Sequence, residues 1–376
     1  MANLWLGYLD SNQEQKNQNL PCCQLHHTPP VPGGPGPTVY FSVPERSSEE
    51  VGGSVTESLT PGRPSATPGV GEKIDGTAGV EEGWAMSPDD VISAGTNVGA
   101  VTLKVADLDA MTAFYRDGVG LAVLSQNGDR VVLGSGGPSV VLEHSPLLKH
   151  APDGAAGLFH TALLFETQAD LARALHSVAT KYPRSFTGSA DHLVSEALYF
   201  DDPEGNGVEL YWDRPRSTWR WDGSRVTMDT KYLDPNVFLH THLSGVASAQ
   251  VLSSTTVGHV HLKVGDVPTA RKFYSDILGF EVTAEFGSQA LFVAAGGYHH
   301  HLGMNTWQSR GARDRSPALG LGEVAIQVPT PDDLGALRER LVAERISIRD
   351  DGRTISFDDP WKNEISASVA EYPAIE

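Results

Sequence analysis

Cysteine is nearly absent from this chain of 376 residues, which contains only Cys22 and Cys23. Two adjacent cysteines cannot close the loops of a disulfide framework, so a disulfide-stapled secreted scaffold is excluded and a reducing, cytoplasmic compartment is expected. The sequence also has no apolar run of roughly 18 residues or more, and its N-terminus lacks a basic stretch followed by an apolar one. Neither a membrane span nor a secretory signal is predicted.

Basic residues are few, with 28 Lys and Arg against 47 Asp and Glu, which gives a formal charge of −19 at pH 7. Nucleic acids and anionic membranes bind clustered cations, so this balance argues against both as partners and favours small molecules. The length and the apolar content of 40% nevertheless allow a sizeable core, divided among two or three domains.

Hydrophobic periodicity is missing from about the first 90 residues, where Pro, Gly, Ser, Thr and Glu dominate, as in the run from Pro29 to Pro37. Such a composition cannot form a packed core, so residues 1–90 are predicted to be disordered. Met86 directly precedes the first patterned region. A native start at Met86 is therefore one hypothesis; mass spectrometry that finds the native N-terminus at Met86 would support it, and peptides from residues 1–85 would contradict it.

An internal repeat begins at Val98. Residues 98–107 match residues 257–266 without gaps, and Phe114-Tyr115 matches Phe273-Tyr274 at the same offset. Each copy alternates apolar and polar residues as a strand does, then has an Asp at a turn, an amphipathic helix and further strands. The repeat therefore predicts a βαβββ unit.

A weaker second pair of units starts at residues 159–165 and 322–328. Both end on Phe-Asp-Asp-Pro-x-x-Asn, at residues 200–206 and 357–363, a pattern typical of a hairpin that leads into a last strand. Four modules are thus predicted, with approximate limits of 96–148, 155–214, 255–308 and 319–371. We expect one two-module domain over residues 96–214, a linker or cap over 215–253, and a second two-module domain over 255–371.

These paired modules, with Asp followed by Phe-Tyr-x-x-x-x-Gly and with Asp-Pro-x-Gly-Asn-x-x-Glu, resemble the vicinal oxygen chelate superfamily of glyoxalases, bleomycin resistance proteins and extradiol dioxygenases. Four modules in one chain, and the run from Gly297 to Trp307, resemble its catechol 2,3-dioxygenase branch. The resemblance implies an α+β fold in which the four βαβββ modules form two cupped mixed sheets. It also implies a mononuclear Fe(II) or Mn(II) centre, an aromatic diol and O2 as substrates, a muconic semialdehyde as product, and it allows a homo-oligomer.

The superfamily places metal ligands near the start of the first strand and on the last strand of each module. At the first-strand position the modules carry, in order, Ala100, His160, His259 and Glu323. A carboxylate stands at the last-strand position of module two, as Glu209. If modules two and three share a cup, His160, Glu209 and His259 converge as a two-histidine, one-carboxylate triad, which suits Fe(II). Pairing of sequential modules, which also occurs in the family, would separate these residues.

Other interpretations of these residues stay open. Glu209 lies on an apolar strand and could face solvent under strand alternation. Glu323 and Glu364 could mark a second metal site in the other cup, although Ala100 and Ser366 make a purely structural cup the favoured interpretation.

Three further residues are candidates for the chemistry around the metal. His192 and Tyr199 precede the Glu209 strand and resemble the extradiol pattern in which a His and a Tyr border the substrate. In the run His299-His300-His301, alternation sends 299 and 301 to one face, and matching of the two Gly-Gly hairpins makes that face the cup. His301 is accordingly predicted to be the acid/base that handles a proton during O–O cleavage. The alternative is a hydrated turn of polar histidines.

Two rival functions remain at the level of the sequence. A glyoxalase-like lyase or isomerase needs a second carboxylate in the cup, where module three offers histidine or glycine. A metal-free, ligand-sequestering protein that resembles the bleomycin resistance group needs no triad. Within the dioxygenases, a hydroquinone could replace the catechol.

Overall fold

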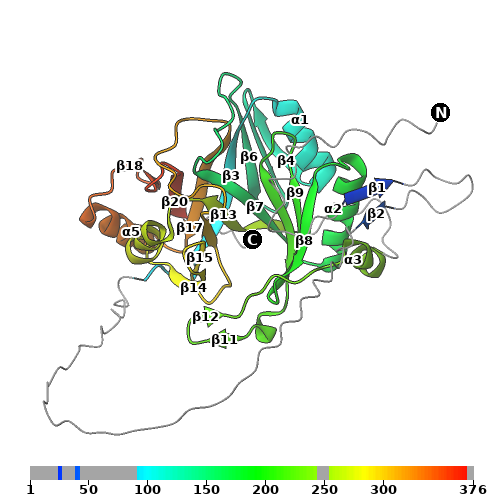
Figure 1. Cartoon of the computed structure of the whole chain (residues 1–376). Helices are drawn as coiled ribbons and strands as arrows, with labels where there is room; N and C mark the ends of the chain where they lie inside the picture. Colours follow the sequence, from blue (N-terminus) through cyan, green and yellow to red (C-terminus); the bar gives the residue numbers. More distant parts are fainter. Residues whose placement is uncertain (1–23, 28–38, 43–90, 244–253, 371–376) are drawn as a thin grey trace, which may run out of the picture.

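The computed structural model describes residues 24–27, 39–42, 91–243 and 254–370 (Figure 1). The two segments within the first 42 residues are the short strands β1 (Gln24–His27) and β2 (Val39–Ser42), which pair with each other antiparallel. The second of these is rich in β-branched and aromatic residues, which favour strands, and here the structure differs from the expected disorder. The rest of residues 1–90, including Met86, lies outside the described residues.

Each repeat copy folds as the predicted βαβββ unit. Module one consists of β3 (Asn97–Val105), α1 (Leu108–Ala113) continuing as the π-helical segment η2 (Phe114–Val119), then β4 (Ala122–Asn127), β5 (Arg130–Gly134) and β6 (Pro138–His144). Module three consists of β13 (Thr255–Lys263), α4 (Val267–Arg271) continuing as η4 (Lys272–Ile277), then β14 (Glu281–Phe286), β15 (Ala290–Ala294) and β16 (Leu302–Asn305). The repeated aspartates Asp107 and Asp266 cap the helices by accepting hydrogen bonds from backbone N–H groups.

The weaker second pair of units has the same element order. Module two consists of β7 (Gly157–Phe165), α2 (Gln168–Lys181), β8 (Phe186–Asp191), β9 (Ser195–Asp201) and β10 (Gly207–Asp213). Module four consists of β17 (Gly320–Val328), α5 (Pro331–Ala343), β18 (Ile348–Asp350), β19 (Thr354–Asp358) and β20 (Glu364–Val369). Thr167 and Thr330 cap the two helices, the latter in a reciprocal capping box with Asp333.

The modules combine into two mixed sheets of eight strands that do not follow sequence order. One sheet runs β14-β15-β16-β13-β7-β10-β9-β8 and joins modules three and two. The other runs β18-β19-β20-β17-β3-β6-β5-β4 and joins modules four and one. In each sheet the two first strands meet antiparallel at the centre, and each runs parallel to the last strand of its own module. The predicted α+β fold is confirmed, and modules two and three share one sheet, which is the condition on which the predicted triad depends.

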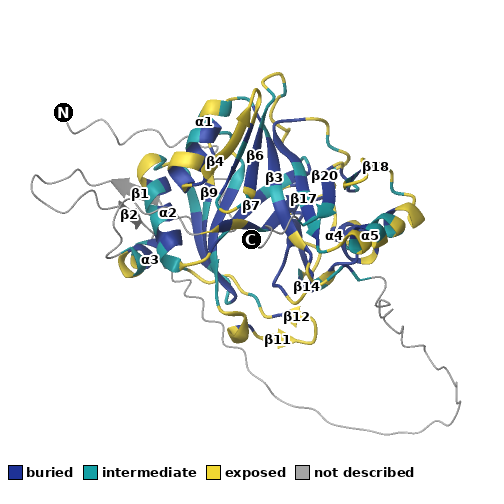
Figure 2. Cartoon of the chain, turned by 180° about the vertical axis from the view of Figure 1, so that it is seen from behind, coloured by how far each residue is buried: buried dark blue, intermediate teal, exposed yellow. Residues whose placement is uncertain are grey.

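Sequential modules are joined in a different way, through a buried tyrosine and the repeated Asp-Pro turn. The Tyr115 hydroxyl of module one donates to Asp202 of module two over 3.1 Å, and the Tyr274 hydroxyl of module three donates to Asp359 of module four over 2.9 Å. In each half of the chain, the tyrosine of the repeated Phe-Tyr pair therefore contacts the aspartate of the repeated Asp-Pro turn. Figure 2 shows the buried strands at the centre and the exposed outer faces of the helices.

The connection between modules two and three contains η3 (Arg216–Thr218), β11 (Trp221–Asp222), β12 (Arg225–Val226) and α3 (Pro235–His242). Its Trp219 and Val226 pack against Val194 of module two and Tyr298 of module three in a small apolar cluster. The connection is thus anchored to both halves of the sheet that holds modules two and three. None of the described helices combines the length and the apolarity that crossing a bilayer requires.

Candidate metal centre

Three adjacent strands at the centre of one sheet carry His160, Glu209 and His259. In the register of β10 and β13 against β7, both Glu209 and His259 lie opposite Ala162, two residues beyond His160. Residues opposite one another, and residues two apart on a strand, share a face of the sheet. The alternation of the strands and their register therefore bring all three side chains to one face.

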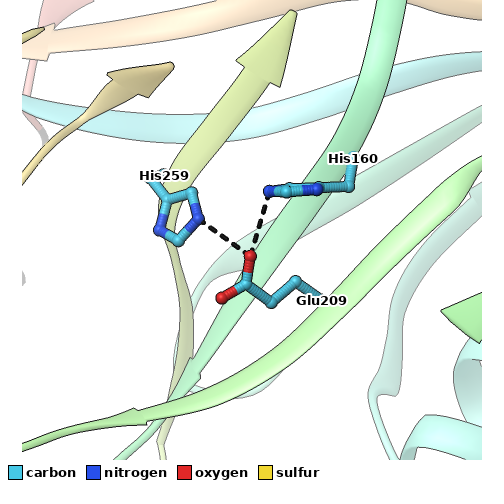
Figure 3. Close-up of side chains that lie close together, drawn as sticks. All are labelled: His160, Glu209 and His259. Atoms are coloured by element: carbon cyan, nitrogen blue, oxygen red, sulfur yellow. Dashed lines mark hydrogen bonds and ion pairs between the residues drawn. The ribbon is translucent and has the colours of Figure 1, made fainter. Parts of the chain in front are cut away.

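The three side chains point toward one another (Figure 3). Glu209 Oε2 lies 2.9 Å from His160 Nε2 and 3.1 Å from His259 Nε2. The potential ligand atoms all lie within 4.8 Å of one another, and all three residues are buried. Glu209 and His259 are each only 2% exposed, which removes the solvent-facing interpretation of Glu209.

The protonation states of this cluster suit a cation. Burial opposes ionisation of Glu209, but the charges and hydrogen bonds of His259 and His160 outweigh it and hold the pKa of Glu209 well below its usual range. Burial lowers the pKa of His259 to about 4, against an opposing effect of Glu209. At neutral pH the site therefore presents a carboxylate and a neutral imidazole, the forms in which these groups bind metals.

The spacing of the three groups also fits a metal ion. In an octahedral site with bonds of about 2.1 Å, adjacent ligand atoms lie about 3.0 Å apart, and the distances from Glu209 Oε2 to the Nε2 atoms of His160 and His259 are close to this value. A facial triad occupies three of the six positions and leaves the others open. In the part of the chain that the structure describes, this is the one cluster of three or more such residues.

Small residues make room at two points beside the triad. Ala162, at the centre of the three ligand positions, is fully buried and extends no further than its methyl group. Gly258 lies beneath the Tyr211 side chain, so that a Cβ on this glycine would fall 1.7 Å from the Tyr211 hydroxyl oxygen. The strand pairing is irregular at this glycine, between Val257 and His259. Close packing thus fixes the position from which His259 reaches the site.

The predicted pair His192 and Tyr199 lies at one side of the triad. Tyr199 is directly opposite Glu209 in the β9–β10 register, and its ring centre lies 5.6 Å from that of His160. His192 Nδ1 donates to the Asp229 carbonyl over 2.9 Å, so in the neutral ring Nε2 accepts from the Tyr199 hydroxyl over 2.7 Å. Burial and the Glu209 charge raise the pKa of Tyr199 well above its usual range, which keeps the hydroxyl protonated.

The three consecutive histidines lie at the other side of the triad, and here the structure differs from the alternation expected of a strand. Strand β16 begins only at Leu302, so residues 299–301 lie in a loop where alternation does not apply. The His300 ring is centred 4.1 Å from that of His259. His301 packs against the Tyr298 ring, and its Nδ1 accepts the Ala295 N–H over 3.1 Å.

Two further residues near the triad escaped the sequence interpretation. His261 lies directly opposite His160, is 3% exposed, and accepts a hydrogen bond at Nε2 from Asn305 over 3.1 Å. Its spacing of two from His259 on one strand was a signal for a shared face. Asp213, at the end of β10 in module two, forms a hydrogen bond with His299 of module three. No local sequence pattern predicts this contact between modules.

Comparisons with known proteins agree with this architecture. The model of the glyoxalase/bleomycin resistance protein/dioxygenase superfamily matches residues 97–210 and 256–366. A catechol-2,3-dioxygenase of Bacillus subtilis is 34% identical over 276 residues, which cover 70% of this chain and 94% of that protein. A biphenyl-2,3-diol 1,2-dioxygenase of Rhodococcus globerulus is 29% identical over 166 residues, 40% of this chain and 83% of that protein.

Among solved structures, a putative dioxygenase from Bacillus subtilis shares the fold with a TM-score of 0.52 at 14% identity, over 74% of this chain and 86% of that one. The family model covers more than half of the chain, and the Bacillus relative matches along nearly its whole length. The chain belongs to the glyoxalase/bleomycin resistance protein/dioxygenase superfamily.

Proposed function

We propose that this protein is an extradiol dioxygenase that inserts O2 into the ring of a catechol-type aromatic diol at a mononuclear non-haem Fe(II) or Mn(II) centre and yields a muconic semialdehyde. The observation that carries the proposal is the buried cluster of His160, Glu209 and His259, with one carboxylate and two imidazoles. The Bacillus relative bears the name of this activity and is similar over 70% of this chain.

A metal bound by this triad would supply open coordination positions for the diol and for oxygen, and would lower the pKa of the diol hydroxyls. The protein's own residues exclude water and position the substrate. Burial of the site keeps bulk water away from the ligand atoms. The Tyr199 hydroxyl donates its proton to His192 Nε2, so its oxygen is placed to accept a hydrogen bond from a hydroxyl group of the substrate.

The reaction would need a proton acceptor beside the triad, and the loop of residues 299–301, which borders His259, supplies three imidazoles. We favour His300 over the sequence-based candidate His301, because the His300 ring lies against that of His259. Burial, with the neighbouring histidines, lowers the pKa of His300 well below its usual range, which favours the neutral, proton-accepting ring at neutral pH. His301 instead packs on Tyr298.

The lyase or isomerase alternative gains no support from the cup. It requires a second carboxylate among the ligands, and the cluster found in the described residues contains Glu209 alone. At the corresponding position of module three, Gly303 faces the His261 ring.

The proposal is tested by anaerobic reconstitution of the purified protein with Fe(II) or Mn(II), followed by measurement of oxygen uptake with catechol. We expect stoichiometric oxygen consumption and the visible absorbance of a ring-opened semialdehyde. Hydroquinone serves as the comparison substrate. A protein that binds metal but consumes no oxygen with any diol contradicts the proposal.

A further inference from the structure

A chain of hydrogen bonds leads from His300 away from the metal centre. The Nδ1 atoms of His300 and His299 lie 2.8 Å apart, and His299 Nε2 lies 3.0 Å from Asp213 Oδ1. The other carboxylate oxygen, Oδ2, accepts from the Tyr298 hydroxyl over 2.8 Å. His299 is fully buried and His300 is 5% exposed, so water has little access to the bond between the two rings.

The chemistry of the partners fixes where the protons lie. An ionised carboxylate only accepts hydrogen bonds, so His299 carries its proton on Nε2 and donates to Asp213. In the neutral ring His299 Nδ1 is then an acceptor, and His300 must donate to it from Nδ1. This leaves the second ring nitrogen of His300, Nε2, without a proton.

The surroundings hold this arrangement in place. Because the single Tyr298 proton goes to Asp213, the Tyr211 hydroxyl donates to the Tyr298 oxygen over 2.8 Å. The Trp219 ring is centred 5.2 Å from that of His299. The Arg216 guanidinium lies 5.1 Å from the centre of the Tyr298 ring and adds a cation–π contact. Residues from module two, from the connection and from module three thus surround the His299 imidazole.

We propose that Asp213 and His299 are positioning residues that hold His300 as the Nδ1–H tautomer, with Nε2 free to accept a proton from the substrate. The inference rests on the proposed function of the site. A carboxylate that fixes the tautomer of a histidine is a known requirement of acid/base sites, and its loss in a serine protease costs about 10⁴ in kcat. Here the carboxylate acts through an intervening imidazole.

The test compares two nearly isosteric variants at one position. His299→Asn places an amide oxygen near the position of Nδ1 and so keeps an acceptor for His300, whereas His299→Leu removes it. We expect His299→Leu to lower kcat about tenfold to a hundredfold with KM and metal content unchanged, and His299→Asn to recover most of that loss. A packing role alone would leave Leu at least as good as Asn in this buried position. Asp213→Leu should match His299→Leu, and the double variant should be no worse than either.

A second readout does not depend on turnover. In the ¹⁵N NMR spectrum of the metal-free, ¹⁵N-histidine-labelled full chain, we expect the wild-type His300 ring to show a protonated Nδ1 and an unprotonated Nε2, and His299→Leu to move the proton toward Nε2. A protonated Nε2 in the wild-type protein, or equal kcat values for the Asn and Leu variants, overturns the proposal. If the reconstituted wild-type protein consumed no oxygen, the proposed function would fall while the spectrum still decided the tautomer.

Discussion

Gly258 shows how closely the candidate metal centre depends on single residues. A Cβ at this position would lie 1.7 Å from the Tyr211 hydroxyl oxygen, and Tyr211 is itself fully buried and hydrogen-bonded to Tyr298. The Tyr211 ring also lies 4.8 Å, centre to centre, from the ring of His259, the residue that follows Gly258. The chain therefore has no room for a methyl group at the point where β13 enters the cup.

We predict that Gly258→Ala lowers the free energy of unfolding by about 1–3 kcal/mol through overpacking, and weakens metal binding because His259 is displaced. Gly188→Ala is the matched control, since a Cβ at Gly188, also on a strand of this sheet, meets nothing within 4 Å. Urea unfolding and metal titration measure both effects. Equal behaviour of the two variants would show that the close approach has no energetic weight.

His300 and His301 are the two candidates for the acid/base beside the triad. We predict that His300→Phe lowers turnover by about a hundredfold or more while metal content is unchanged, because the His300 ring lies against that of His259. His301→Phe, which replaces a ring packed on Tyr298, should have the smaller effect. Steady-state oxygen uptake compares the two. A larger loss in His301→Phe would restore the candidate that the sequence favoured.

Single residues were predictable from the sequence where strand alternation governs them. His160, Glu209 and His259 stand at matching positions of the modules, and the register of regular strands brings them together. The side-chain directions of residues 299–301 were not predictable, because these residues precede β16 and pack against Tyr298, Trp219 and Asp213.

At the scale of elements, the buried carboxyl group of the Asp-Pro turn before β10 binds the helical segment of module one. Asp202 accepts hydrogen bonds from the Tyr115 hydroxyl and from Asn206. Burial nevertheless dominates and raises the pKa of Asp202 from 3.8 to about 6. Because the folded-state pKa lies above the unfolded one, the protonated group contributes stability below pH 3.8 that is lost as the pH rises through 6.

We predict that the stability of the wild-type protein relative to Asp202→Asn decreases between about pH 4 and pH 7, by up to about 3 kcal/mol. The amide of the variant keeps hydrogen-bonding capacity but cannot ionise. Urea unfolding of both proteins across this range gives the difference. Parallel stability profiles would mean that Asp202 titrates as it does in the unfolded chain.

The elements themselves followed from local signals. The aspartates before each repeat helix become N-caps, and Gly120 and Gly279 take left-handed conformations with φ of 101° and 87° where the helical segments end. The connection after β10 was less predictable. Its Trp219 is ordered by Val194 and Tyr298, residues from two modules, which local sequence does not reveal.

At the scale of the whole molecule, both sheets are assembled across the middle of the chain. The seams β7–β13 and β3–β17 each join a strand that precedes the connection to one that follows it. The sequence predicted the first seam through an inventory of ligands, since only this pairing unites two histidines with a carboxylate. The same inventory held no argument for the pairing of β3 with β17, because that cup carries Ala100 and Glu323 in the corresponding places.

We predict that residues 1–243 and 254–376, produced separately, each bind no metal with the affinity of the whole chain, and that co-expression restores it. His160 and Glu209 lie in the first part and His259 in the second, and each part alone leaves the central strand of both sheets unpaired on one side. The metal content of the isolated parts and of the co-purified parts tests this prediction. Full binding by the first part alone would contradict the shared cup.

The most direct test of the central claim is the stoichiometry of anaerobic Fe(II) binding in the full-length protein and its variants. Glu323→Ala is the control, because Glu323 holds in module four the position that His160 holds in module two. We predict one Fe(II) per chain in the wild-type protein and in Glu323→Ala, and loss of binding in His160→Ala, Glu209→Ala and His259→Ala. Retention of Fe(II) in any of the three triad variants with wild-type affinity, or its loss in Glu323→Ala alone, would contradict a metal centre shared by modules two and three.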